Sequence, residues 1–140
     1  MKILLAADGS PFTMKALNFL VNHPGLTEKD GELVVLNVQP PLPPGVTGMV
    51  SSDMVNDYYR DETAKVLPPI EEFLGRHPIR FRCLAAVGHA VEEILRTAKT
   101  EKADLIAMGT QGHGVLGRLV MGSVSQRVAT QSELPVLLIK

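Results

Sequence analysis

The sequence predicts an α/β fold in which one domain, residues 1–140, forms an open five-stranded parallel sheet with helices on both faces. Short apolar runs bounded by turn residues alternate along the chain with segments whose apolar residues recur every three to four positions. The run Leu33-Val34-Val35-Leu36 is apolar at every position and does not alternate with polar residues, and this is typical of parallel strands covered on both faces. Strands that alternate with helices require right-handed crossovers, which place helices on both sides of one sheet.

The first β–α unit is marked by dense turn signals. An apolar run predicts a strand from Lys2 to Ala7, and it ends at Asp8-Gly9-Ser10-Pro11. Pro11 suits the first turn of a helix, and apolar residues at helical spacing continue that helix from Phe12 to Val21. A second strand is predicted from Gly31 to Val38.

The middle of the chain is rich in proline. We expect residues 39–48 to form an exposed loop that is neither helix nor strand ladder. Residues 51–76 are predicted to be mostly helical, with a kink or break near Leu67 because Pro68-Pro69 removes two backbone donors. The side chains available for an inner face of this segment are Met54, Tyr58, Val66, Ile70, Phe73 and Leu74.

The second half continues the alternation. It predicts strands at Ile79–Val87, Asp104–Met108 and Pro135–Ile139, and helices at Gly88–Thr100 and Ser123–Gln131. In open sheets of this kind, ligands sit outside the carboxyl ends of the strands, where the strand order reverses. If the first and fourth strands are neighbours, Asp8 and the loop that begins at Gly109 face one crevice.

Composition limits the classes of partner. Lys and Arg number 14 against 15 Asp and Glu, the net charge is −1, and the basic residues are scattered, which argues against a nucleic acid partner. The apolar runs are too short to span a bilayer, so we expect neither membrane insertion nor export. The one cysteine, Cys83, excludes an intramolecular disulfide framework, and a cytoplasmic location fits best.

Two glycine patterns match known motifs by letter but not by context. Residues 112–117 spell the dinucleotide fingerprint G-x-G-x-x-G, but they do not open the first β–α turn, and Glu133 precedes the last strand instead of ending it. Residues 117–123 resemble a P-loop, yet Ser123 stands where the phosphate-binding lysine should be. Neither a nicotinamide or flavin site nor efficient nucleotide hydrolysis is therefore supported.

A third glycine pattern agrees with its context, because it follows a strand and leads into a helix. This pattern is Gly109-x2-Gly112-x9-Gly122-Ser123. Together with Ala7-Asp8-Gly9-Ser10, residues 103–109 and the ending 134–139, it closely resembles the universal stress protein family over essentially the whole chain. The resemblance implies a Rossmann-like fold of the adenine nucleotide alpha hydrolase type. The long glycine pattern is similar to the signature of the family's ATP-binding branch.

The resemblance also implies a set of binding residues. Asp8 resembles the acidic residue that lines the nucleoside pocket, and Val38 is similar to the residue whose backbone meets the adenine. The ribose and phosphate wall corresponds to Met108, Gly109 and Gly112, and the triphosphate cradle to Gly122, Ser123 and Val124. Three neighbours of these residues complete the candidate site, namely Ala7, Gln111 and His113.

Simpler structural roles stay open for several of these residues. Ser123-Val124-Ser125-Gln126 is a capping-box sequence, so Ser123 could cap its own helix. Asp8 could bond the backbone of its own turn. Arg118 could meet phosphate or point to solvent, and Gly114 and Gly117 could do no more than permit the loop geometry.

A nucleophilic hydrolase finds little support. The four histidines, His23, His77, His89 and His113, show no spacing that would serve a serine or thiol nucleophile. Cys83 lies in a predicted strand and is interpreted as a small core residue. Among the histidines, His113 inside the glycine loop is a better candidate for phosphate contact than His89.

These inferences combine into one functional prediction. The chain is expected to be a cytoplasmic ATP-binding module that binds ATP or a related adenine nucleotide with Mg²⁺, has no catalytic residue we can name, and signals to an unidentified partner. The resemblance implies a homodimer that pairs through the final strand. A slow ATPase or phosphotransferase, and an interaction module of the same fold that binds no nucleotide, are the alternatives.

Overall fold

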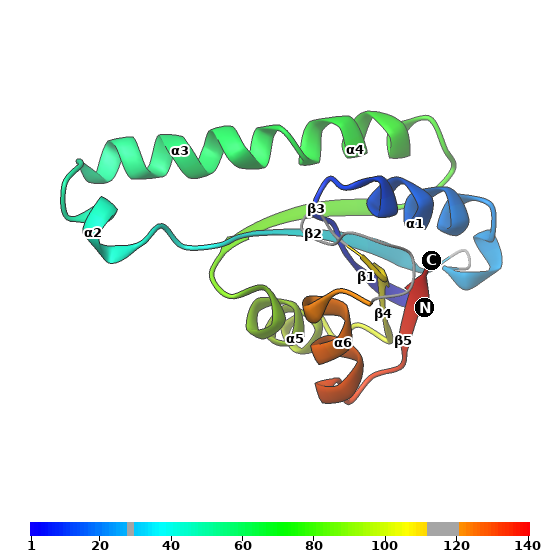
Figure 1. Ribbon diagram of the computed structural model, residues 1–140. Coiled ribbons are helices and arrows are strands. Elements are labelled where there is room, and N and C mark those ends of the chain that lie inside the picture. The colour runs from blue at the N-terminus through cyan, green and yellow to red at the C-terminus, as the bar shows by residue number, and fades with distance from the viewer. Residues whose placement is uncertain (28–29, 112–120) are drawn as a thin grey trace.

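All five predicted strands are present in one parallel sheet. The computed structural model describes residues 1–27, 30–111 and 121–140. The strands lie in the order β3-β2-β1-β4-β5 (Figure 1). Their bounds are β1 Lys2–Ala6, β2 Glu32–Gln39, β3 Phe81–Val87, β4 Leu105–Gly109 and β5 Val136–Ile139. The expectation that the first and fourth strands are neighbours is confirmed, because β1 pairs with β4 as well as with β2.

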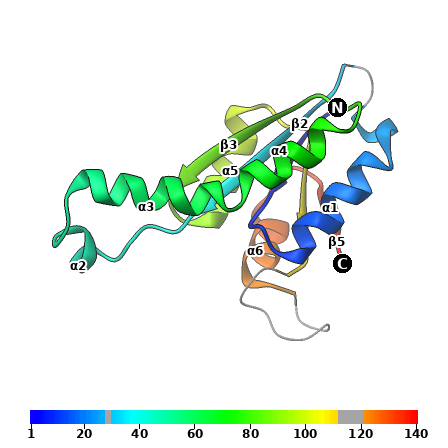
Figure 2. The same cartoon turned by 90° about the horizontal axis from the view of Figure 1, so that it is seen from above.

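Helices cover both faces of the sheet, as predicted. One face carries α1 (Pro11–Val21) and α4 (Leu67–Gly75), and the other carries α5 (Ala90–Thr100) and α6 (Ser123–Gln131) (Figures 1 and 2). A 3-10 turn, η1 (Pro24–Leu26), follows α1. Because successive strand residues point to opposite faces, Ile3 and Leu5 belong to the core under α1, whereas Leu4 belongs to the core under α5 and α6.

The helical segment 51–76 breaks at the place where the prolines predicted a kink or break. Helix α3 (Ser52–Ala64) ends before α4 begins at Leu67, and the prolines stand in the first turn of α4, where a missing N–H costs no helix bond. The two helices differ in burial. Helix α4 buries Leu67, Ile70 and Leu74, but α3 buries no residue.

The expectation that Met54 and Tyr58 belong to an inner face is wrong. Their side chains are 59% and 44% exposed. Figures 1 and 2 show the reason, because α3 extends past the end of the sheet and has no strand beneath most of its length. The apolar residues of α3 therefore recur with the 3.6-residue period of a helix, but no core covers that side of the helix.

The prediction for residues 39–48 also requires correction. Gln39 is the last residue of β2 and pairs with Val87, so the ladder enters this segment. Helix α2 (Pro44–Thr47) occupies part of the remainder. Proline is tolerated at the first position of a helix because the N–H that it lacks has no partner there, which explains how a helix begins at Pro44.

Smaller differences concern the ends of elements. Strand β4 runs from Leu105 and includes Gly109, so the loop that follows starts one residue later than the sequence suggested. The helix expected from Gly88 begins at Ala90, whereas α6 has the predicted bounds. Within the described residues, no helix combines the length and apolar character that crossing a membrane requires.

Candidate functional site

A cavity of about 320 Å³ opens at the carboxyl ends of the central strands. Its position follows from the sheet register, in which Ala6 at the end of β1 lies beside Leu36 of β2 and Met108 of β4. The connection from β1 leads to α1 on one face, and β4 leads to α6 on the other. The cavity therefore lies where ligands bind in open α/β sheets.

The cavity contains every candidate site residue that the structure describes. These residues are Ala7, Asp8, Val38, Met108, Gly109, Gln111, Gly122, Ser123 and Val124. Gly112 and His113 lie outside the described residues, as do Gly114, Gly117 and Arg118. The other lining residues were not predicted from the sequence; they are Ala6, Ser10, Thr13, Leu36, Ala90, Ile94 and Ser125.

The apolar and polar parts of the lining come from different elements. The ends of β2 and β4 supply Leu36, Val38 and Met108, and α5 supplies Ala90 and Ile94. Polar groups come from the start of α1 and from the start of α6. The cavity thus combines an apolar wall with two helix starts, and a helix start presents backbone N–H groups that have no partner inside the helix.

Asp8 organises the start of α1. Its Oδ1 accepts a hydrogen bond from the Ser10 backbone N–H at 2.9 Å and another from Thr13 Oγ1 at 3.1 Å. Thr13 Oγ1 in turn accepts from the Asp8 backbone N–H at 3.2 Å. Gly9 between them has φ +80°, a conformation that glycine adopts without strain. Asp8 is therefore a turn residue that also lines the cavity, so the turn interpretation is correct without removing Asp8 from the site.

Gly109 allows the start of α1 to approach the end of β4. A Cβ placed on Gly109 would lie 2.4 Å from Phe12 Cβ, closer than any real contact between two carbon atoms of this kind. The absence of a side chain at this position is therefore a packing requirement. Sequence reasoning assigned Gly109 to the ligand wall only, because the approach of Phe12 depends on tertiary structure.

The alternative role left open for Ser123, that it caps its own helix, is not found in the structure. The N-cap of α6 is Gly122, no side chain caps the helix, and Ser123 is the exposed first residue of the helix. Ser125 Oγ instead donates to the carbonyls of Thr110 at 2.8 Å and Gly122 at 2.9 Å. The Gly122 backbone N–H also donates to the Thr110 carbonyl at 2.7 Å. These bonds fix the start of α6 against the end of β4.

Ser10 is buried in the cavity wall, and its side-chain hydroxyl has no hydrogen bond within the described part of the chain. The residue is 1% exposed. Although Ser10 is the N-cap residue of α1, its side chain does not cap the helix. The sequence placed Ser10 in a turn and in the motif that resembles the family, but the unpaired hydroxyl is visible only in the folded chain.

Two other candidates do not line the cavity. His89 is exposed at the start of α5, in an adjoining hollow that shares Ala90 and Val124 with the cavity and also includes Arg127. Cys83 is half-buried in β3, where burial raises the pKa of its thiol to about 11. A thiol with so high a pKa is a poor nucleophile near neutral pH, which agrees with the interpretation of Cys83 as a core residue.

Comparison with known proteins identifies the family. The profile of the Universal stress protein family (Usp) matches residues 1–140. The chain belongs to the universal stress protein family. The universal stress protein YxiE of Bacillus subtilis is 30% identical over 147 residues, which cover 99% of this chain and 98% of that protein.

Solved structures of the family share the fold. The MJ0577 protein of Methanocaldococcus jannaschii superimposes with a TM-score of 0.83 and 28% identity, and the match covers 99% of this chain and 94% of that one. A universal stress protein from Arabidopsis thaliana, with AMP bound, superimposes with a TM-score of 0.70 and 18% identity over 100% of this chain and 91% of that one. This universal stress protein therefore belongs to a family of stress-response proteins, some of which bind nucleotides.

Proposed function

We propose that this universal stress protein binds ATP, or a related adenine nucleotide, in the cavity at the carboxyl ends of β1, β2 and β4. The observation that carries the proposal is the division of the cavity into an apolar wall and the amide-bearing start of α6. An adenine nucleotide has the same division, because a flat apolar base is joined through a sugar to anionic phosphates. The AMP complex of the Arabidopsis relative supports the choice of adenine.

The apolar wall suits the base. Val38 and Met108 approach from the strand ends and Ile94 from α5, so the base would be enclosed by aliphatic side chains. Ligand pockets are commonly lined in this way, with few polar groups that fix the orientation. Asp8 stands beside the wall and would accept hydrogen bonds from the nucleoside.

The start of α6 suits the phosphates. Helix starts carry partial positive charge and unpaired N–H groups, and they bind phosphates in many nucleotide sites. Gly122, Ser123 and Val124 all line the cavity at this point, and the first turn of α6 contains no acidic residue that would repel an anion. Ser123 has its hydroxyl at the exposed first position of the helix, where it would donate to a phosphate oxygen.

Mg²⁺ would accompany the phosphates. The described residues contain no group of three or more His, Cys, Asp or Glu side chains that could hold a metal ion. We therefore propose that Mg²⁺ enters with ATP and is coordinated through the phosphates and water, as is usual for this ion. Its contribution is to neutralise phosphate charge.

The role that we propose is signalling coupled to binding. A nucleotide between the starts of α1 and α6 would favour one arrangement of these elements, and a partner protein, as yet unidentified, would read the resulting surface. Rapid hydrolysis is not proposed, because we can name no general base or arginine finger for it. Slow ATP hydrolysis is the second candidate.

Nucleotide released from the purified protein tests the proposal. Freshly purified protein is denatured, the released nucleotide is identified by chromatography, and ATP, ADP and AMP binding is measured by calorimetry. We expect an adenine nucleotide to be released and ATP to bind the wild type. Gly122→Val should weaken binding, whereas Gly75→Val, at an exposed position with no atom within 4 Å of an added Cβ, should not. Absence of both release and binding at millimolar concentration would contradict the proposal.

The same samples separate binding from catalysis. ADP or AMP that accumulates with incubation time, and whose accumulation is abolished by Gly122→Val, would favour the slow enzyme. A constant nucleotide content favours the binding module.

We further propose a homodimer that pairs through β5. This strand is at one edge of the sheet, and each of its residues is half-buried and apolar. An unpaired apolar edge invites association with another strand. Light scattering should give twice the 15.2 kDa chain mass, with β5 amides that exchange faster on dilution. The mass of a single chain at every concentration would contradict the dimer.

A further inference from the structure

Ser10 offers a hydrogen-bonding group that the folded chain does not use. Of the buried side-chain polar atoms in the described residues, Ser10 Oγ is the one without a hydrogen-bond partner. Buried hydroxyls are nearly always paired, since leaving one unpaired costs free energy. The exception in this protein lies in the wall of the cavity that we propose as the nucleotide site.

The polar groups around Ser10 restrict which part of a ligand could meet it. The Asp8 carboxylate accepts the Ser10 backbone N–H, so a negative charge stands two residues from the hydroxyl. Thr13, in the first turn of the same helix, is bound to that carboxylate as well. A phosphate placed here would be repelled by Asp8. An uncharged polar group would not be repelled, and such groups are found on the base and the sugar of a nucleotide.

The phosphates have a separate place in the cavity. Ser125 binds the carbonyl of Thr110 and so holds the start of α6 against the end of β4. Strand β4 is paired with β1, and α6 and α1 lie on opposite faces of these two strands (Figure 1). The amides of α6 therefore enter the cavity from the face opposite α1. The two helix starts thus divide the polar lining into an acidic side at α1 and an amide side at α6. Ser10 belongs to the acidic side.

We infer that Ser10 Oγ is a nucleoside-binding hydroxyl that pairs with an uncharged polar group of the ligand and is left unpaired when the ligand is absent. This inference rests on the proposed nucleotide function and adds a specificity-determining residue to it. It requires that Ser10 contribute to binding through the nucleoside and not through the phosphates. It also requires that the hydroxyl contribute nothing to the stability of the free protein.

The second requirement predicts that removing the Ser10 hydroxyl does not lower the stability of the free protein. Removing a paired buried hydroxyl destabilises a protein, but removing an unpaired one is neutral or stabilising. Ser10→Ala should therefore leave the melting temperature of the ligand-free protein equal or higher, while weakening the binding of both AMP and ATP about three- to tenfold, the loss of one neutral hydrogen bond. Melting curves and calorimetry measure the two quantities on the same sample.

Ser132→Ala is a matched control, for which the opposite effects on melting temperature and nucleotide affinity are expected. Ser132 Oγ accepts the Leu134 backbone N–H at 3.0 Å and donates to the Leu134 carbonyl at 2.9 Å, away from the cavity. Ser132→Ala should lower the melting temperature of the free protein and leave nucleotide affinity unchanged. Ser10→Cys, which keeps a weak donor of similar size, should bind AMP with an affinity between those of the wild type and Ser10→Ala.

Each other outcome overturns the inference in a recognisable way. Unchanged affinity of Ser10→Ala for AMP and ATP rejects the contact while leaving the nucleotide function intact. A loss seen with ATP but not with AMP moves the contact to the phosphates. A lower melting temperature of free Ser10→Ala shows that the hydroxyl is paired in the free protein. If the wild type binds neither AMP nor ATP, both the proposed function and this inference are rejected.

One further ligand locates the contact within the nucleoside. With 2′,3′-dideoxy-AMP, the wild type and Ser10→Ala should bind equally if the partner of Ser10 is a sugar hydroxyl. The difference between them should persist if the partner is the base. Both results support a nucleoside contact.

Discussion

At the scale of single residues, the cavity depends on positions whose roles are set by neighbours distant in sequence. Asp8 was predicted to be either a turn residue or a site residue, and its bonds to Ser10 and Thr13 show the first role at a cavity-lining position. Gly109 and Ser125 are different. Gly109 has no side chain because Phe12 packs against it, and Ser125 is needed because its hydroxyl binds the Thr110 carbonyl. Neither contact can be predicted from the spacing of residues in the sequence. Turn chemistry within one segment was therefore predictable, whereas contacts between the helix starts and the end of β4 were not.

Substitution of Gly109 tests this packing. In Gly109→Ala, the new methyl group would lie 2.4 Å from Phe12 Cβ, so α1 or β4 must move. We expect a loss of about 1–3 kcal/mol in the free energy of unfolding, typical of overpacking, and weaker nucleotide binding. Urea denaturation measures the first effect. Gly75→Ala, where the added methyl meets no atom within 4 Å, is the control and should lose no stability. Equal urea midpoints for Gly109→Ala and the wild type would contradict the close approach.

At the scale of elements, α3 and α4 show what periodicity can and cannot predict. Their apolar spacing predicted helices, and the paired prolines predicted a kink or break, which the structure shows to be a break between the two helices. The shared inner face is wrong for α3, because the sheet ends before α3 does (Figure 1). Periodicity specifies the apolar side of a helix, but the length of the neighbouring strands decides whether that side is covered.

Two substitutions measure this difference in burial. Ile70 in α4 is 1% exposed, so Ile70→Ala should cost about 2–5 kcal/mol of the free energy of unfolding. Met54 in α3 is 59% exposed, so Met54→Ala should change the same quantity by no more than about 0.5 kcal/mol. Urea denaturation of both variants checks the values. A large loss in Met54→Ala would mean that α3 packs against a surface outside this chain.

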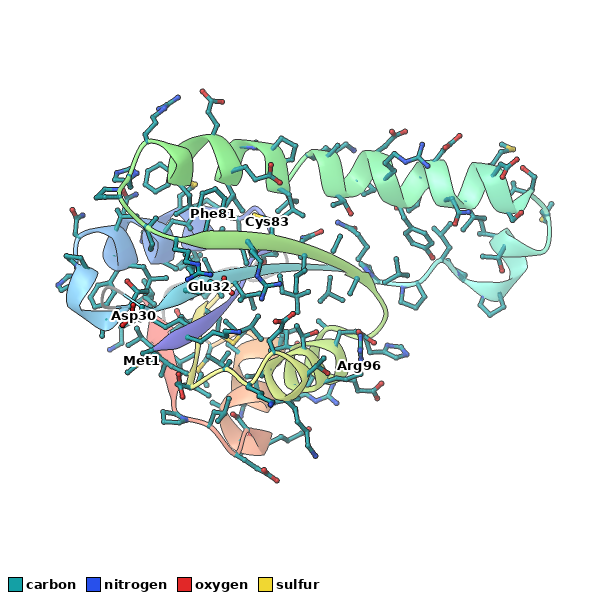
Figure 3. All side chains as sticks on the ribbon, turned by 180° about the vertical axis from the view of Figure 1, so that it is seen from behind. Met1, Asp30, Glu32, Phe81, Cys83 and Arg96 are labelled. Atoms are coloured by element: carbon teal, nitrogen blue, oxygen red, sulfur yellow. The ribbon has the colours of Figure 1, made fainter. Side chains whose placement is uncertain are left out.

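Charged side chains form ion pairs at the amino ends of the strands, at the end of the sheet opposite the cavity. Glu32, labelled in Figure 3, begins β2 and lies 2.9 Å from Arg82 Nη2 of β3, with Lys2 and Arg80 within 4.0 Å. The hydrogen bond from Arg82 and the nearby cations hold the pKa of Glu32 below its ordinary value of 4.5. Arg82 also pairs with Glu101 at the end of α5, so these charges connect β1, β2, β3 and α5.

The lowered pKa of Glu32 predicts how stability changes with pH. A carboxyl whose pKa is lower in the folded chain adds stability above its unfolded value, and this contribution is lost as the pH falls below 4.5 through the folded pKa. Glu32→Gln should therefore be less stable than the wild type at pH 7, and the difference should shrink in acid. Glu72→Gln, which removes an exposed i,i+4 pair with Arg76, should show little difference at either pH. A constant gap for Glu32→Gln would contradict the ion pairing.

At the scale of the whole molecule, the sheet was predictable because each strand carries its own signal. Continuous apolar runs predicted five parallel strands, and the position of Asp8 and the glycine loop at strand ends predicted a shared crevice between β1 and β4. The proline-rich segment was less predictable, since Pro44 can open a helix as readily as it can end one. The one-domain boundary at residues 1–140 stays a prediction.

The distribution of cavities provides an internal control for the ligand site. A second cavity of about 430 Å³ lies at the other end of the sheet, lined by Leu95 and Lys102 near the end of α5 and by Ser132 after α6. It is larger than the proposed site, so volume alone would favour it. The second cavity is lined by the ends of α5 and α6, whereas the cavity at the carboxyl ends is lined by an apolar wall and by helix starts.

Amide chemical shifts on titration with ATP and Mg²⁺ test the central claim most directly. If the nucleotide binds at the carboxyl ends of the strands, the signals of Val38, Gly109 and Val124 will shift together with one saturation curve. Those of Leu95 and Lys102 will stay in place. Shifts confined to the second cavity, or no shifts at saturating ATP, would contradict the account.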